Sequence, residues 1–271
     1  MKRVSSIALI CLLGYIVSCK RVDDGDVTPD QLSQLSKCPL KGITTSKGTP
    51  FNSFEYTLGR IKRIINYDSL QVASTFTYNA KNQIEKMVIE DETSNSEKYT
   101  VLYVYDASSG KIVKTKTSIK DFEFMTNDFV YSGDNIKTIQ TTFNVFGSKV
   151  VGTTKVEYVD ENVSKVYTKI DGYPELLTFE GVGYDTKPQF YPAGYKTMAL
   201  GFVGIANNFF AFFGKNNATL VKIYDDNGKL DETTQIDYEY NKSGFPTKAV
   251  QTLTKSNVKT TQGLVFTFMC N

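Results

Sequence analysis

The sequence predicts an all-β protein: an antiparallel β-meander of repeated hairpins, strongly curved or barrel-like, with a short N-terminal helix. Three observations support this prediction. Tyrosine and phenylalanine are abundant, at 17 and 18 of 271 residues, and β-branched residues recur throughout the chain. A tyrosine-marked repeat runs along most of the chain, and the residues before several of these tyrosines alternate with a period of two. About twelve to sixteen strands are expected from this spacing.

The repeat consists of an aromatic residue, a run of turn residues and then an aliphatic or aromatic residue. From Tyr78 the intervals are 27, 26 and 27 residues, which reach Tyr158, and 26 more residues reach Tyr184. A period of this size indicates a repeated supersecondary unit, here two strands and two turns. The matching stretches are Tyr56–Ile61, Tyr78–Ile84, Tyr105–Ile112, Tyr131–Ile136 and Tyr158–Val163, followed after a gap by Tyr224–Leu230 and Tyr240–Phe245.

Alternation before the tyrosines indicates strands with one buried and one wet face. Ile236, Tyr238 and Tyr240 fall on one side of a strand, and the polar residues between them fall on the other. The Asn, Asp and Gly residues after each tyrosine can supply the positive φ angles of tight hairpins.

The stretch Val221–Glu232 contains the acidic group Asp225, Asp226 and Asn227 followed by Gly228. Its place in the repeat indicates a turn. A calcium site remains an alternative, although the oxygen ligands do not have the alternating spacing of an EF-hand loop. We predict no metal and no cofactor.

Composition restricts the chemistry. The chain has no histidine, which excludes Ser-His-Asp and Cys-His mechanisms and His-ligated zinc or iron. Without Lys2 and Arg3 the chain has 29 basic and 29 acidic residues. This balance gives no electrostatic reason to expect a nucleic-acid partner.

Residues 1–18 have the pattern of a lipoprotein signal peptide. Lys2 and Arg3 precede an apolar stretch that is too short for a stable membrane span. Ser18 and Cys19 end it like a bacterial lipobox, so Cys19 is the predicted lipidation site. An ordinary secretory signal with a chance cysteine is the alternative.

Residues 19–37 are predicted to be an acidic tether and a short helix. Asp23, Asp24 and Asp26 resemble the surface-export signal of Bacteroidota lipoproteins, and a plain solvated tether is the alternative. Thr28 and Gln31 form a capping box around Pro29, which predicts a helix over Pro29–Leu35. We therefore expect an outer-membrane protein held by acyl chains and exposed at the surface, or facing the periplasm.

Residues 38–271 are predicted to form one β-meander domain with an apolar insertion at 190–217. One interpretation is a long connection that covers or plugs the apolar face of the sheet. The other is an exposed surface for a ligand, partner or membrane. Its candidate residues are Phe202, Phe209, Phe210, Phe212 and Phe213.

Cys38 and Cys270 lie near the two ends of this domain. In an exported protein a disulfide between them is one expectation, and two buried thiols are the other. A catalytic role is not expected, because no histidine is present to lower a thiol pKa.

Three stretches carry a family resemblance: Tyr184–Pro188, Lys215–Asn217 and Tyr238–Lys248. In this order along the chain, together with the lipobox, they resemble a family of Bacteroidota lipoproteins described as having a porin-like β-fold. The resemblance spans most of residues 19–271. It implies an exported, all-β, lipid-anchored protein, and no catalytic residues can be transferred from it.

The function predicted from these observations is that of a lipid-anchored cell-envelope lipoprotein with a non-catalytic binding or structural role. Its ligand would be a glycan, a protein or an envelope component. The alternatives are a carrier of a lipid or other apolar ligand, and a hydrolase that uses paired carboxylates. Alternation alone does not separate a meander outside the bilayer from a transmembrane barrel, although the lipid anchor favours the former.

Overall fold

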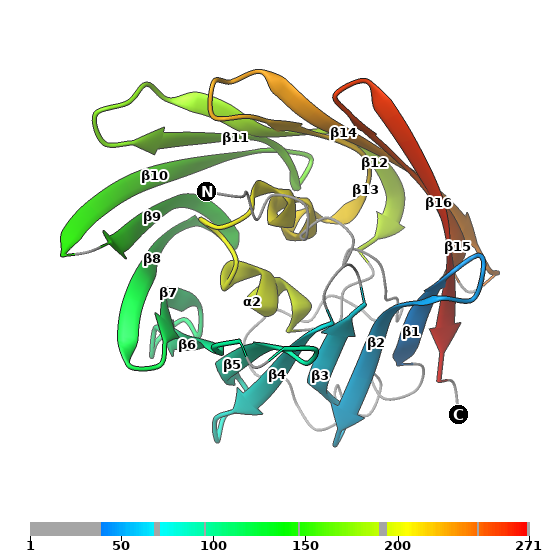
Figure 1. The fold of residues 1–271 in the computed structure, drawn as a ribbon, viewed down its shortest axis with the longest axis horizontal. Helices are drawn as coiled ribbons and strands as arrows, with labels where there is room; N and C mark the ends of the chain where they lie inside the picture. Colours follow the sequence, from blue (N-terminus) through cyan, green and yellow to red (C-terminus); the bar gives the residue numbers. More distant parts are fainter. Residues whose placement is uncertain are drawn as a thin grey trace.

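The chain forms a closed antiparallel β-barrel in which each strand pairs with its neighbours in sequence and β1 pairs with β16 (Figure 1). The computed structural model describes residues 39–67, 71–94, 96–145, 147–189, 194–242 and 244–269. Within these residues there are sixteen strands, which confirms the predicted all-β meander and shows that it closes. The predicted helix at Pro29–Leu35 lies outside the described residues.

The strands are short in the first half of the barrel and longer in the second. Their bounds are β1 Leu40–Thr45, β2 Pro50–Thr57, β3 Arg60–Asn66, β4 Val72–Tyr78, β5 Ile84–Asp91, β6 Tyr99–Tyr105, β7 Ile112–Ile119, β8 Phe122–Ser132, β9 Asn135–Val145, β10 Ser148–Val159, β11 Asn162–Ile170, β12 Leu176–Pro188, β13 Asn216–Tyr224, β14 Leu230–Tyr240, β15 Pro246–Lys255 and β16 Val258–Phe268. Two short helices, α2 (Tyr195–Leu200) and the 3₁₀ helix η1 (Asn207–Phe213), lie between β12 and β13. Within the described residues, neither helix has the length and hydropathy needed to cross a membrane.

The tyrosine repeat corresponds to a structural unit. At Tyr56, Tyr78, Tyr105, Tyr131 and Tyr158 the strand register shifts, so that a β-bulge precedes each hairpin turn. The aliphatic residue that closes each unit then pairs with its tyrosine and points into the core. These partners are Ile61, Ile84, Ile112, Ile136 and Val163, and all are buried.

Successive units are linked through the tyrosine hydroxyls. Tyr78 donates a hydrogen bond of 2.8 Å to the carbonyl of Ile61, one unit earlier. Tyr105 makes the same contact with Ile84 at 2.9 Å, and Tyr131 with Ile112 at 2.8 Å. The repeat therefore encodes a side-chain link between neighbouring hairpins as well as their turns.

The hairpin turns of this repeat lie at one end of the barrel, here called the tyrosine rim. The chain leaves β12 at this rim after Pro188, forms the insertion, and returns to the same rim at Asn216. The insertion thus occupies the position of a hairpin turn, and β13 begins at Asn216. Since β13 runs away from this rim, the Tyr224–Leu230 turn lies at the other end, here called the opposite rim.

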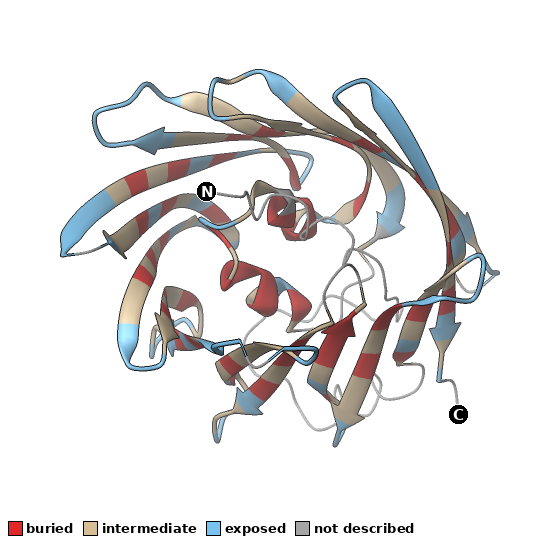
Figure 2. Ribbon diagram, in the orientation of Figure 1, coloured by how far each residue is buried: buried red, intermediate tan, exposed pale blue. Residues whose placement is uncertain are grey.

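The inner face of the barrel holds the core, and the outer face carries charge. Buried residues alternate along the strands and make up most of the two inner helices. Turns and strand ends are exposed (Figure 2). On the outside, Lys114 pairs with Asp128 at 3.0 Å across β7 and β8. Lys222 pairs with Glu180 at 3.2 Å across β12 and β13.

Exposed apolar residues on the outer wall are interspersed with charge. Leu102 lies directly between Lys86 of β5 and Lys116 of β7. Val250 lies beside Asp237 of β14. The wall therefore has no continuous apolar stripe at these strands.

Candidate functional site

The insertion between β12 and β13 is a plug inside the barrel. We define the plug as its described residues 194–215, which contain α2 and η1, and Figure 1 shows both helices enclosed by the ring of strands. Gly194 has a φ of 100° and begins the turn into α2. The sequence did not predict these helices, because the apolar run has no helical periodicity distinct from that of a buried loop.

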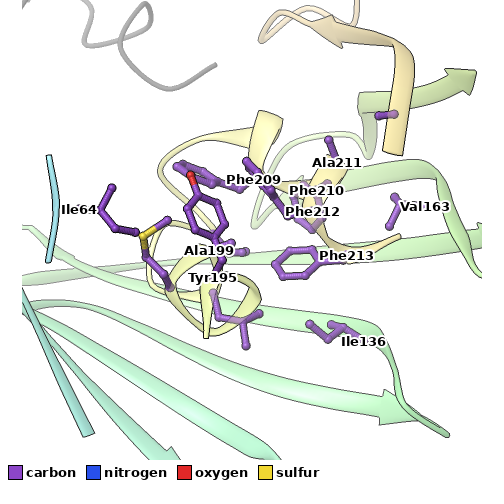
Figure 3. Close-up of a cluster of buried hydrophobic side chains, with 14 of the residues drawn as sticks. Ile64, Ile136, Val163, Tyr195, Ala199, Phe209, Phe210, Ala211, Phe212 and Phe213 are labelled. Atoms are coloured by element: carbon purple, nitrogen blue, oxygen red, sulfur yellow. The ribbon is translucent and has the colours of Figure 1, made fainter. Parts of the chain in front are cut away.

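The phenylalanines of the plug pack inside the barrel. The side chains of Phe209, Phe210, Phe212 and Phe213 are all at most 5% exposed, and they gather between the plug and the walls (Figure 3). Phe202 and Phe209 stack with ring centroids 4.8 Å apart. The aromatic ring of Phe212 lies 5.2 Å from that of Tyr195, and Phe210 packs against Phe179 of β12.

The phenylalanines predicted as a ligand or partner surface are the ones that pack in the plug. The structure brings Phe202, Phe209, Phe210, Phe212 and Phe213 together as part of the core, with Phe202 half-buried. The arrangement is that of a connection that plugs the apolar face of the sheet, and these rings do not form an exposed patch.

Hydrogen bonds hold the plug to the wall. The amide nitrogen Nδ2 of Asn127 donates to the carbonyl of Val203 at 3.0 Å, and its Oδ1 accepts from Thr141 at 2.7 Å. Gln189 donates to the carbonyl of Ala211 at 2.8 Å. Gly201 lies so close to the wall that a Cβ there would be 2.8 Å from Oη of Tyr103, which explains the glycine at this position.

The inner face of the wall also carries buried polar residues. On several strands a buried polar residue lies closer to the opposite rim than a buried apolar residue that faces the same way; Asn52 before Phe54 in β2 and Thr234 before Ile236 in β14 are examples. These polar residues are uncharged and come from strands all around the barrel. We call them the polar belt: Asn52, Asn66, Ser74, Thr115, Thr117, Asn127, Thr141, Thr154, Thr234 and Gln251.

Part of the polar belt is internally bonded. Asn127 links Thr115 and Thr141, with an Nδ2 to Thr115 Oγ1 distance of 3.2 Å. By contrast, Asn52 is 2% exposed, and neither its Nδ2 nor its Oδ1 has a hydrogen-bond partner among the described residues. The hydroxyls of Thr117 and Thr234, each 1% exposed, are likewise without a partner there. Buried polar atoms of this kind are rare in proteins and require an explanation.

The opposite rim combines aromatic residues with ion-paired groups. Tyr99 and Phe124 meet edge to face with centroids 6.0 Å apart. An open hollow of about 590 Å³ nearby is lined by Glu97, Ile119, Lys120, Asp121 and Phe122. Lys255 binds Asp231 at 2.9 Å and Glu232 at 3.5 Å. Burial raises the pKa of Glu232, partly offset by Lys255, while the carboxylates hold the pKa of Lys255 above its usual value.

The tyrosine rim carries a separate polar cluster where the chain enters and leaves the plug. Tyr240 donates a hydrogen bond to the carboxylate of Asp185, and Asn217 Nδ2 lies 3.2 Å from Asp185 Oδ2. Burial and the Asp185 carboxylate both raise the pKa of Tyr240. A shallow hollow of about 490 Å³ beside Asp185 is lined mainly by β11, β12 and the β10–β11 turn. Every group named in this cluster has a protein partner. We therefore interpret the cluster as a structural contact that joins the two ends of the plug segment.

The acidic stretch at Asp225 forms a hairpin turn. Its Oδ1 accepts hydrogen bonds from the backbone nitrogens of Asn227 at 2.8 Å and Lys229 at 2.9 Å, which is the pattern of an Asx-turn. These bonds hold the pKa of Asp225 below its usual value. No group of three His, Cys, Asp or Glu side chains among the described residues is placed to hold a metal ion.

The remaining predicted site residues, Cys19, Cys38 and Cys270, lie outside the described residues. The polar belt was not predicted from the sequence. The pattern that could have revealed it is a polar residue at an inward-facing position of a strand, as at Thr117 in β7. Threonine is so common in strands that this pattern is not distinctive.

Comparisons with known proteins give limited information. No protein-family model matches the chain, and no curated protein matches it. The chain is similar to the crystal structure of a porin-like protein from Bacteroides vulgatus ATCC 8482, with 12% identity and a TM-score of 0.48 over 84% of this chain and 98% of that one. It is also similar to a porin-like protein from Bacteroides uniformis ATCC 8492, with 15% identity and a TM-score of 0.32 over 80% of this chain and 76% of that one. Both similarities are weak, and nothing about the function of this chain follows from them.

Proposed function

We propose that this chain is an exported, lipid-anchored protein of the outer membrane with a non-catalytic binding role, whose barrel stands outside the hydrocarbon layer. The observation that carries the proposal is the polarity of the wall. Its inner face carries the apolar core that packs on the plug, and its outer face bears cross-strand ion pairs such as Lys114–Asp128. A transmembrane barrel has the reverse arrangement, with an apolar band outside and a polar interior.

Energetics supports the same placement. Lys114, Lys116 and Lys222 lie on the outer face within strands, and each is ion-paired with a carboxylate at 3.0 to 3.2 Å. A lysine on the lipid face near the bilayer midplane costs about 2–4 kcal/mol, and several such residues would oppose insertion. In water the same pairs are well solvated and cost little.

The plug favours a binding role for the barrel and disfavours a role as a pore. The rings of Phe209, Phe210, Phe212 and Phe213 lie buried inside the barrel, where a pore would need open space. The same packing leaves little apolar wall free for a lipid, which disfavours the carrier alternative. The acyl anchor at Cys19 would then supply the only attachment to the membrane, as the lipobox predicts.

The test compares the full chain with a Cys19→Ala variant in a bacterial host that processes lipoproteins. We expect radiolabelled palmitate to enter the wild-type protein and to be absent from the variant. The variant should be recovered from the osmotic-shock fluid, folded and without detergent. If the variant stays in the membrane fraction and needs detergent, the strands are in the bilayer and the proposal is wrong.

A further inference from the structure

We propose that Cys38 and Cys270 form a disulfide that closes the barrel covalently at the tyrosine rim. The sequence leaves a disulfide and two buried thiols as alternatives, and the register of the neighbouring residues favours the disulfide. The proposal rests on the proposed export of the chain, because disulfides form and persist in oxidising compartments. The described residues next to each cysteine carry it, since the cysteines themselves lie outside the described part of the chain.

The first and last strands set the register at this end of the barrel. β1 and β16 run antiparallel, and the pair nearest the tyrosine rim in their ladder is Leu40 with Phe268. One residue further out, the backbone nitrogen of Met269 donates a 2.7 Å hydrogen bond to the carbonyl of Pro39. The antiparallel register therefore extends beyond the two strands to Pro39 and Met269.

The two cysteines are the next residues in this register. Cys38 precedes Pro39, and Cys270 follows Met269. Pairing that continues by one residue on each side places Cys38 directly opposite Cys270. The bond between Met269 and Pro39 marks theirs as a hydrogen-bonded pair, and such pairs alternate with non-hydrogen-bonded pairs in an antiparallel ladder. The cysteines thus fall at a non-hydrogen-bonded position, where Cα atoms lie about 4.5 Å apart, within the range of about 4.4–6.8 Å that a disulfide spans.

The expected direction of the side chains agrees with this pairing. Residues two apart along a strand point to the same face, so Cys38 shares the face of Leu40 and Cys270 shares that of Phe268. Leu40 is fully buried. Phe268 packs against the core and lies 5.2 Å from Phe245 between ring centroids. In this register both thiols therefore point to the same, core-facing side of the sheet.

The seam between β1 and β16 is the place where a covalent link has the largest effect. Every other strand pair among the described residues joins neighbours in sequence, whereas this pair joins the two ends of the domain. β1 has six residues, and its register shifts between Leu40 and Gly42. Pro39 has no N–H group with which to return the hydrogen bond that it accepts from Met269. A cross-link that closes so long a loop removes conformational entropy from the unfolded chain and so stabilises the closed barrel.

The bond forms by a two-electron oxidation. The two thiols form one S–S bond, and their two protons and two electrons pass to the disulfide of a thiol–disulfide oxidoreductase, which is reduced to two thiols. The other two cysteines of the chain have different fates in the proposed function. Cys11 lies in the predicted signal peptide, and the thiol of Cys19 is the predicted site of acylation.

The test uses the full chain, expressed with its own signal in a bacterial host and purified from whole cells in detergent, with iodoacetamide present throughout. Trypsin separates the two cysteines into the peptides 38–41 and 260–271. We expect mass spectrometry to find these peptides joined in the absence of a reductant and separate in its presence. Recovery of both peptides in alkylated form without a reductant would overturn the proposal.

Thermal unfolding distinguishes a disulfide from two separate buried thiols. Reduction of the wild type, Cys38→Ser and Cys270→Ser should each lower Tm by about 5–10 °C, because all three break the same bond. The double variant should have the Tm of either single variant. It is also the matched control, since a reductant should leave its Tm unchanged. Additive effects of the two substitutions, together with no effect of the reductant on the wild type, would contradict the disulfide.

The disulfide and the lipid anchor can fail separately. Joined peptides in a protein that does not incorporate palmitate would refute the anchor and support the disulfide. Free thiols in a palmitate-labelled protein would refute the disulfide and leave the anchor intact. A dimer that is seen on a non-reducing gel and lost on reduction would show that the cysteines pair between chains, which would also overturn the proposal.

Discussion

The hydroxyl of Tyr105 donates a 2.9 Å hydrogen bond to the backbone carbonyl of Ile84 on the neighbouring hairpin. Ile84 is itself the aliphatic residue paired with Tyr78, which bonds in turn to Ile61. Each hairpin is thus held to the one before it by a side chain that also marks its own bulge. This relationship explains why tyrosine, rather than phenylalanine, recurs at these positions.

We expect Tyr105→Phe to lower the free energy of unfolding by about 1 kcal/mol, because it deletes one buried hydrogen bond while retaining the ring. Urea unfolding followed by circular dichroism measures the change. Tyr173→Phe, at a tyrosine that is 68% exposed, is the control and should be neutral. An equal effect of both substitutions would argue against a structural role for the hydroxyl link.

The buried tyrosines should make the barrel sensitive to alkali. Burial raises the pKa of Tyr78 to about 12, and burial also raises the pKa of Tyr103, Tyr105 and Tyr158. The unfolded chain ionises near pH 10, so stability is full below pH 10 and falls as pH rises above it. For Tyr78 alone the loss between pH 10 and 12 is about 3 kcal/mol. Absorbance at 295 nm should show phenolates appearing together with unfolding; gradual ionisation of a folded barrel would contradict this.

Gly181 lies where β12 bends past a tyrosine link. A Cβ at this position would be 2.3 Å from both Oη of Tyr184 and the carbonyl of Val163, which are hydrogen-bonded to each other at 2.5 Å. We therefore expect Gly181→Ala to destabilise the barrel by about 1–3 kcal/mol. Gly152→Ala in β10 is the control, since its Cβ would make only ordinary contacts at 3.6 and 4.0 Å. Equal melting temperatures for the two variants would refute the proposed crowding.

The plug should contribute strongly to stability. Phe212 is fully buried between the plug and the wall, so Phe212→Ala is expected to cost about 3–5 kcal/mol in urea unfolding. Ile205, on the same plug but 51% exposed, is the control, and Ile205→Ala should cost less than about 0.5 kcal/mol. A small effect of Phe212→Ala would mean that the barrel is stable without a packed plug, and limited proteolysis would then show cleavage within it.

Much of the architecture could be read from the sequence because its signals are local. A tyrosine, a turn and an aliphatic residue lie within eight positions, so one pass along the chain reveals the hairpins. The same rule finds the Tyr224–Leu230 hairpin, but it does not reveal that this turn lies at the opposite rim. A local pattern carries no record of which end of the barrel a strand has reached.

The sequence by itself determined the all-β class, the hairpin units and the absence of histidine chemistry; its lipid anchor at Cys19 and the pairing of Cys38 with Cys270 remain predictions. Only the tertiary structure decided that the sheet closes, that the phenylalanine-rich insertion enters the barrel, and that the polar belt faces one lumen. The physical reason is that closure joins β1 to β16 and brings Asn52, Thr117 and Thr234 to a common interior from distant parts of the chain. Each of these residues looks like an ordinary strand or turn residue in its own segment, and its environment exists only once the ring of strands is complete.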